Sequence, residues 1–212
     1  MKVTELQLMN RRTLMKLLGT SVLAAWAGFG CDPAVQSDSA ANSSDDEDSA
    51  MKQTVKVKVF NSRGELVGPI EEAKVVKTDQ QWKAQLTANQ YQIARAKGTE
   101  PAFCGNLLDN HKTGVYTCVC CKLPLFSSDS KFQSGTGWPS FFKPVAEENV
   151  HKHLDTSYGM QREEILCTRC DCHLGHVFDD GPNPTGLRFC VNSASLEFTP
   201  SDQLATLAEA KA

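Results

Sequence analysis

Cys190 lies among residue types that could support thiol chemistry. The run 186–196 (GLRFCVNSASL) is predicted to form one strand, in which alternate side chains share a face. Arg188 and Asn192 would then flank Cys190 on one face of the strand. The guanidinium favours a thiolate, and the carboxamide can hold a developing oxyanion or a substrate. The pattern predicts a nucleophile with a lowered pKa. A buried structural cysteine within a strand is the alternative interpretation.

Two C-x-x-C pairs predict a structural zinc ion. Cys118 and Cys121 form the first pair, and Cys167 and Cys170 form the second. Four thiolates complete a tetrahedral zinc site and leave no open position for catalysis. The segment between the pairs is long, so the ion would join two distant hairpins. Disulfides and a redox-active C-x-x-C pair are the alternatives.

Cys120 and Cys172 lie beside these pairs and could compete as ligands. Only the set of Cys118, Cys121, Cys167 and Cys170 keeps the C-x-x-C spacing in both pairs, which favours these four as the zinc ligands. The sequence therefore leaves Cys120 and Cys172 without an assigned role in metal binding.

Three further clusters carry side chains suited to binding or proton transfer. Residues 135–141 (GTGWPSF) place Trp138 in a glycine-rich loop, where its ring could line an apolar pocket. His173 and His176 closely follow a cysteine pair, and paired histidines serve as metal ligands or as acid–base groups. A turn that contains Asp180 comes next. Taken singly, each cluster is equally consistent with a satisfied turn or core residue.

The composition is that of one domain with extensions. The chain has 212 residues, a net charge of −3 and nine unevenly placed cysteines. No basic stripe with interleaved aromatic residues occurs in the sequence, which argues against a nucleic-acid partner. Nothing in the sequence indicates an oligomer, so a monomer is expected.

Residues 1–30 resemble a twin-arginine export signal. Arg11 and Arg12 precede an apolar stretch over 14–29. A transmembrane anchor is the alternative, although the stretch is short for a span. Cys31 is a candidate lipid attachment site, and an A-x-A cleavage site just before it is the other possibility. Both outcomes place the mature domain outside the cytoplasm, in the periplasm or as a membrane-anchored lipoprotein.

The rest of the chain divides by its patterning. Residues 31–51 are acidic and rich in serine, which predicts a solvated linker. Residues 52–74 contain a strictly alternating run and a turn signal, which predict a β-hairpin extension. Capping boxes that begin at Thr78 and Thr87 predict two short helices. From Gly114 onward, short β-rich runs alternate with turns, as is typical of an antiparallel β domain.

Several motifs together resemble the B-type methionine sulfoxide reductases, the MsrB family. They occupy residues 98–103 (GTEPAF), 134–141 (SGTGWPSF), 173–178 (HLGHVF), 181–188 (GPNPTGLR) and 190–196 (CVNSASL). The resemblance covers a domain over 75–200 and leaves a tail over 201–212. It implies a mainly β fold of two antiparallel sheets stapled by zinc, with short N-terminal helices. It also implies reduction of the R epimer of methionine sulfoxide in oxidised proteins.

The resemblance further implies a pocket around Cys190. Its members would be Trp138, Phe141, His173, His176, Asp180, Arg188 and Asn192. Cys190 would attack the sulfoxide sulfur and become a sulfenic acid. The histidines and the aspartate are the available proton donors, and Trp138 would contact the methyl group on the sulfur.

One position departs from a common family pattern. Many members carry the resolving cysteine where this chain has Thr136. Cys104 is the favoured substitute, since some members use a cysteine there, and Cys172 is the second choice. If neither serves, an external thiol must reduce the sulfenic acid. The resemblance implies a thioredoxin-like final reductant.

Two other functions fit part of the sequence. A non-catalytic zinc β module could bind a small ligand at Trp138, in which case Cys190 would be dispensable. A general thiol–disulfide exchanger could use Cys104 and Cys190 without any sulfoxide. Arg188 and Asn192 beside Cys190 argue against the first, and the exchanger would leave Trp138 and the histidines without a role.

Overall fold

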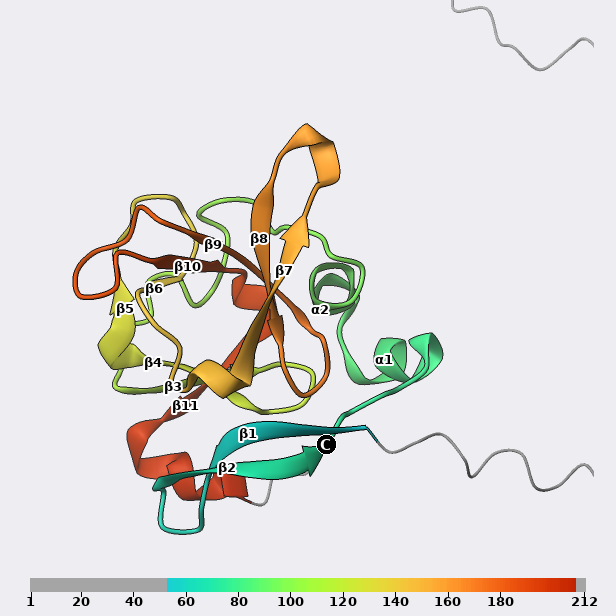
Figure 1. Ribbon diagram of the computed structural model, residues 1–212, viewed down its shortest axis with the longest axis vertical. Coiled ribbons are helices and arrows are strands. Elements are labelled where there is room, and N and C mark those ends of the chain that lie inside the picture. The colour runs from blue at the N-terminus through green and yellow to red at the C-terminus, as the bar shows by residue number, and fades with distance from the viewer. Residues whose placement is uncertain (1–52, 209–212) are drawn as a thin grey trace, which may run out of the picture. The chain divides into compact units, whose positions relative to one another are not determined.

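The computed structural model describes residues 53–208 of the chain (Figure 1). The predicted export signal, Cys31 and the linker up to residue 51 lie outside these residues. Within them, no helix is both long and apolar enough to cross a bilayer. The predictions of export and of lipid attachment stay predictions.

Two antiparallel sheets form the body of the domain. The larger sheet has the strand order β5-β6-β10-β9-β8-β7. Its strands are β5 (Lys131–Phe132), β6 (Ser140–Phe141), β7 (Val150–Asp155), β8 (Arg162–Cys167), β9 (His173–Phe178) and β10 (Arg188–Val191). The smaller sheet has the order β11-β3-β4 and contains β3 (Gly114–Cys118), β4 (Pro124–Ser127) and β11 (Leu196–Pro200). The predicted mainly β fold with antiparallel sheets is confirmed.

Aromatic side chains from both sheets meet in the core. Phe141 of β6 stacks on Phe126 of β4 with ring centroids 4.5 Å apart, and it meets Tyr116 of β3 edge-on at 5.0 Å. Phe189 of β10 packs on the same Phe126 ring. Because successive residues of a strand face opposite ways, burying Phe141 and Phe189 turns Ser140 and Cys190 to the other face of the larger sheet.

The two predicted helices are present and begin at the predicted capping boxes. Helix α1 (Asp79–Gln85) follows Thr78, and α2 (Ala88–Ala94) follows Thr87. In each box the threonine hydroxyl accepts from a backbone N–H three residues on, and the glutamine there accepts from the threonine N–H. Trp82 of α1 and Ile93 of α2 are buried. Each helix thus packs an apolar side chain against the domain.

The predicted N-terminal hairpin is also present. Strands β1 (Thr54–Phe60) and β2 (Leu66–Ala73) form a separate two-stranded antiparallel sheet. Buried Asn149 fastens this hairpin to the domain: its carboxamide accepts from the Lys58 N–H and donates to the Lys58 carbonyl, each at 2.8 Å. Val57 of β1 is fully buried in the main core. The hairpin is therefore part of the folded unit.

The prediction of a single strand over 186–196 is wrong. The strand β10 ends at Val191, and a 3-10 turn over Ser193–Ser195 leads into β11 of the other sheet. The carboxylate of Glu100, far away in sequence, accepts from the Ser193 and Ala194 N–H groups and stabilises this turn. Local patterning cannot register such a partner, which is why the strand was predicted too long.

Short 3-10 helices complete the described chain. Besides the turn over Ser193–Ser195, they span Ser128–Ser130, Glu147–Asn149, Ser157–Gly159 and Ser201–Ala208. The last of these is the described part of the predicted tail.

Candidate active site and metal centre

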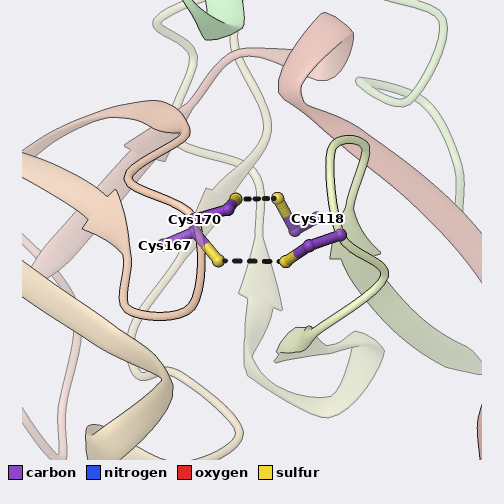
Figure 2. A group of neighbouring side chains, drawn as sticks. Cys118, Cys167 and Cys170 are labelled. Carbon is purple, nitrogen blue, oxygen red and sulfur yellow. Dashed lines mark hydrogen bonds between the residues drawn. The ribbon is translucent and has the colours of Figure 1, made fainter. Parts of the chain in front are cut away.

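Four cysteine sulfurs converge in a buried cluster suited to a metal ion. Cys118 ends β3 and Cys121 lies in the turn to β4, whereas Cys167 ends β8 and Cys170 lies in the turn to β9. The Cys118–Cys170 and Cys121–Cys167 sulfur pairs are each 3.6 Å apart. Figure 2 shows the Cys118 and Cys170 side chains pointing toward one another. Zinc–sulfur bonds of about 2.3 Å in a tetrahedron place sulfurs about 3.8 Å apart. The cluster therefore fits a structural zinc ion.

The sulfur distances do not fit disulfides. A disulfide bond joins sulfurs at about 2.05 Å, whereas the cluster pairs lie at 3.6 Å, and every cysteine in residues 53–208 is a free thiol. Zinc would hold the β3–β4 turn against the β8–β9 turn, and so would link the smaller sheet to the larger one. The predicted ligand set is thus brought together by the fold.

Cys120 and Cys172 form a second group at the same place. Their sulfurs and that of Cys118 lie within 4.8 Å of one another, and both residues are buried. The Cys172 thiol also contacts the carbonyl of His173 at 3.6 Å. Cys172 therefore belongs to the metal cluster, which weakens its case as the resolving cysteine.

Cys190 lies on the outer face of the larger sheet, beside a cavity. It is half-buried and pairs across the ladder with His176 of β9 and Ser140 of β6. Directly paired residues point to the same side of a sheet, so the imidazole and the thiol share this face. The cavity has a volume of about 140 Å³. Its polar and aromatic lining comes from Thr99, Trp138, Arg162, His176, Phe178, Cys190 and Asn192.

The Cys190 thiol is not acidified in this structure. Burial raises its pKa above the usual value, and the Arg188 charge and a contact with Thr136, whose Oγ1 lies 4.0 Å from the sulfur, only partly offset that effect. The Arg188 guanidinium is itself engaged in two hydrogen bonds of 2.8 Å with Asp180. The predicted lowering of the Cys190 pKa is therefore wrong for the resting protein, because a paired cation is a weak source of thiolate stabilisation.

Asp180 serves as the partner of Arg188 in this arrangement. The hydrogen bonds from Arg188 lower the pKa of the Asp180 carboxyl. The Arg188 guanidinium also lies over the Phe178 ring, 4.3 Å from its centroid, and is buried. An ionised carboxylate has no proton to donate, so the two histidines remain as proton donors.

The two histidines occupy different positions. His176 lines the Cys190 cavity and pairs through Nε2 with Asp155 at 2.8 Å. His173 does not line the cavity; its Nδ1 pairs with the buried carboxylate of Glu164 at 2.7 Å, and burial lowers its pKa. Its Nε2 is buried without a protein partner. His176 is therefore the histidine placed next to the thiol.

Trp138 and Phe141, both predicted to bind substrate, have different fates. Trp138 lines the cavity, and its indole N–H donates to the carbonyl of Glu100 at 3.0 Å. Phe141 is 0% exposed and lies in the aromatic core on the opposite face of the sheet. The prediction for Phe141 is wrong, because residue 140 and not residue 141 shares the Cys190 face.

Asn192 lines the cavity but its carboxamide is engaged with backbone groups. It accepts from the Glu100 N–H at 3.1 Å and donates to the Leu174 carbonyl at 3.1 Å. One amide hydrogen is left for a ligand, since a carboxamide offers two. Asn192 therefore joins the Glu100 segment to the end of β10.

Comparison with known proteins identifies the domain. Residues 86–200 match the family model described as the SelR domain. A peptide methionine sulfoxide reductase MsrB of Hahella chejuensis is 57% identical over 129 residues, which are 61% of this chain and 93% of that relative. The MsrB of Leptospira interrogans is 58% identical over 125 residues, or 59% of this chain and 95% of the relative. The chain belongs to the MsrB family of peptide methionine sulfoxide reductases.

The MsrB-matched segment contains every described site residue. It also contains three residues that the sequence did not single out: Glu100, Asp155 and Arg162. Glu100 lies in the GTEPAF motif, which contributes to the family resemblance but does not by itself predict a role for this residue. The other two lie outside the quoted motifs, and only the pairing of β7, β8 and β9 brings them beside His176. The hairpin of β1 and β2 precedes the MsrB match.

Asp155 and Arg162 form one polar group with His176. Asp155 Oδ2 accepts from His176 Nε2 and from Arg162 Nη2, each at 2.8 Å. Hydrogen bonds from Ser157, then His176 and the Arg162 charge, hold the pKa of Asp155 well below its usual range. The carboxylate can therefore orient the imidazole.

The resolving position of many MsrB proteins is occupied here by Thr136, which lies 4.0 Å from the Cys190 sulfur. Cys104 is exposed and lies in a neighbouring loop. The N–H of the preceding Phe103 donates to the Gly137 carbonyl at 2.8 Å, which ties this loop to the one that carries Thr136 and Trp138. Cys104 thus lies in a segment bound directly to a wall of the cavity.

Proposed function

We propose that the chain reduces peptide-bound methionine-R-sulfoxide with Cys190 as the nucleophile. The observation that carries this proposal is the shared face of Cys190 and His176 beside a small cavity walled by Trp138. Family membership supports the reaction. The preference for the R epimer is inferred from the resemblance to the MsrB family.

The chemical step transfers one oxygen between two sulfurs. The Cys190 thiolate attacks the sulfoxide sulfur and forms an S–S bond, while the sulfoxide oxygen takes up a proton. The S–O bond to the substrate and the new S–S bond then break as the hydroxyl passes to the Cys190 sulfur, which leaves Cys190 as a sulfenic acid and releases methionine. The substrate sulfur gains two electrons and the Cys190 sulfur loses two. Because burial raises the pKa of Cys190, the thiol must pass its proton to a base before or during the attack.

His176 is the proposed site of proton transfer. Its imidazole shares the thiol's face of the sheet and can accept the Cys190 proton or deliver one to the sulfoxide oxygen. Asp155 would hold the ring in place throughout. His173 supports the site from the interior through Glu164, and Trp138 provides an apolar surface for the methyl group.

Cys104 is the proposed resolving thiol. Its thiol would condense with the Cys190 sulfenic acid to a disulfide and release water, and a thioredoxin-like dithiol would then reduce the disulfide. Cys104 is exposed, as an attacking thiol and a target for a reductant must be. Formation of the bond requires the loop at 103–105 to approach Cys190.

Export of the enzyme is a separate proposal that rests on sequence. Paired arginines, the apolar stretch and Cys31 support secretion, with or without lipid attachment. Fractionation of cells that express the full chain, with Arg11→Lys/Arg12→Lys as the matched control, tests it. Retention of the unaltered chain in the cytoplasm would contradict export, and equal amounts of both proteins outside the cytoplasm would contradict only a dependence on the paired arginines.

The reductase proposal is tested with the full chain loaded with zinc. Epimer-resolved peptide methionine sulfoxide is supplied with dithiothreitol, and loss of each epimer is followed by chromatography. We expect loss of the R epimer alone, abolished in Cys190→Ser. Turnover of neither epimer by folded, zinc-loaded protein would overturn the proposal and favour a ligand-binding module.

The resolving role is tested in the same protein with thioredoxin as the sole reductant. Cys104→Ser should lose most turnover with thioredoxin and keep it with dithiothreitol, which can reduce a sulfenic acid directly. Cys172→Ser is the matched control. Full activity of Cys104→Ser with thioredoxin would refute the assignment.

A further inference from the structure

A second, larger cavity adjoins the Cys190 cavity. It has a volume of about 520 Å³, and Trp138 lines both cavities. The loop over 134–138 separates them: Thr136 contacts Cys190, whereas Ser134, Gly135 and Gly137 line the larger cavity. Whatever enters the Cys190 cavity past Trp138 is therefore next to the larger one.

The larger cavity has apolar as well as polar side chains in its lining. Phe103, Leu108 and Phe132 line it together with Trp138. Phe103 is 69% exposed, so its ring offers apolar surface to a ligand of the cavity. Its backbone N–H is nevertheless fixed to the Gly137 carbonyl. An apolar surface is thus held open beside the proposed active site.

The wall of this cavity is fixed before any ligand binds. Lys131 lines the cavity, and its ammonium donates to the carbonyls of Leu107, Leu108 and Asn110 at 2.7–2.9 Å. Three charge-assisted hydrogen bonds hold the segment that carries Leu108. A pre-formed wall reduces the cost of ordering on binding.

The two volumes suggest a division of labour. Ligand pockets in proteins generally measure about 300–1,000 Å³, so the Cys190 cavity of about 140 Å³ can take little more than one side-chain end. The neighbouring cavity of about 520 Å³ lies within that range. A peptide substrate carries further residues on both sides of its methionine sulfoxide, and these need a surface next to Trp138.

We propose that the cavity at Phe103, Leu108 and Phe132 binds an apolar residue adjacent to methionine sulfoxide in the substrate peptide. The inference rests on the proposed reductase function and gives that function a sequence preference. A concave site of this size fits a side chain of an extended peptide better than the surface of a globular reductant. Docking of the reductant is therefore the competing outcome.

The preference is measured with three R-sulfoxide substrates and dithiothreitol. These are a blocked single residue, a peptide with glycine on both sides, and the same peptide with leucine on both sides. We expect kcat/KM for the leucine peptide to exceed that for the glycine peptide about tenfold. Leu108→Glu places a carboxylate in the cavity and should reduce this ratio to about one, because a charge disfavours the apolar side chain.

Two controls keep the outcomes apart. Leu108→Glu should turn over the blocked single methionine-R-sulfoxide at the wild-type rate, because that substrate has no neighbouring residue to place in the cavity. Val76→Glu should keep the full leucine-to-glycine ratio of kcat/KM, since Val76 is 79% exposed and does not line the cavity. A tenfold ratio unchanged by Leu108→Glu would overturn the subsite. So would an increase in KM for thioredoxin alone, which would assign the cavity to the reductant. Failure of the wild type on all three substrates would instead remove the reductase function.

Discussion

The metal cluster and the Cys190 site use the same side chain in opposite surroundings. In the cluster, four buried sulfurs converge, and the Cys118–Cys170 and Cys121–Cys167 sulfur pairs are each 3.6 Å apart. At the active site a single thiol lies half-buried on a sheet face, and Thr136 contacts it at 4.0 Å. Thiolates that share a cation become structural, whereas an isolated thiol stays available for reaction.

The difference shows that cysteine function depends on which neighbours the fold supplies. The four cluster cysteines have one another as neighbours, and a bound metal ion would complete their chemistry. Cys190 has a cation that is already paired with Asp180 and an imidazole held by Asp155. Its surroundings can be completed only by a substrate. Four substitutions test this contrast, from the largest expected effect to the smallest.

Loss of a zinc ligand should have the largest effect. Cys121→Ser is expected to lose the metal and to lower the free energy of unfolding by about 5 kcal/mol or more, because zinc binding contributes directly to folding. Metal content and thermal unfolding are the measurements. Cys190→Ser, the matched control, should keep both. A Cys121→Ser protein of wild-type stability would remove the structural role of the cluster.

Glu100 should matter for turnover without touching a reacting atom. Its carboxylate caps the turn after β10, its carbonyl holds Trp138, and its N–H holds Asn192. Glu100→Ala is expected to lower kcat about 10- to 100-fold through misplacement of the pocket while zinc is retained. Glu100→Gln, which keeps one acceptor oxygen, should recover part of the loss. Equal kcat values for the wild type, Glu100→Ala and Glu100→Gln would show that the Ser193–Ser195 turn forms without the Glu100 carboxylate.

Asp180 should influence the acidity of the thiol. Burial is the main cause of the raised pKa of Cys190, and the charge of the Asp180 carboxylate, which is paired with Arg188, raises this pKa further. Asp180→Asn should lower that pKa and speed iodoacetamide alkylation of Cys190 at pH 7 about three- to tenfold. Arg188→Gln should slow it. The rates are compared in a Cys104→Ser background, and a slower reaction in Asp180→Asn would reverse the assigned sign.

Cys172 should have the smallest effect. It lies in the cluster with Cys118 and Cys120 but outside the four-ligand set. Cys172→Ser is expected to keep zinc and to retain turnover with thioredoxin within about twofold, at a stability cost of about 1 kcal/mol. A selective loss of thioredoxin-supported turnover would make Cys172, and not Cys104, the resolving thiol.

Features encoded by neighbours in sequence could be predicted from the sequence. Both capping boxes lie within four consecutive residues, and both helices begin where the boxes predict. The hairpin at the N-terminus follows from alternation and a turn signal. The grouping of Cys118, Cys121, Cys167 and Cys170 follows from their spacing, even though the two pairs are distant in the chain.

Features that depend on distant partners were predicted wrongly or not at all. The end of β10 depends on Glu100, which caps the following turn from far away in sequence. The core position of Phe141 depends on which face of β6 meets the smaller sheet. The raised pKa of Cys190 reflects burial and the pairing of Arg188 with Asp180. Asp155 and Arg162 gain their roles only when three strands align.

Asn149 joins the N-terminal hairpin to the domain in the way that a neighbouring strand would. Its carboxamide offers Lys58 both a donor and an acceptor. The same side chain also donates to the Pro124 carbonyl of β4, so it bridges the hairpin and the smaller sheet. The hairpin forms a sheet of its own, so its attachment adds no strand to either of the other two sheets. A protein that begins at Val75 would show how much of the domain folds without this bridge.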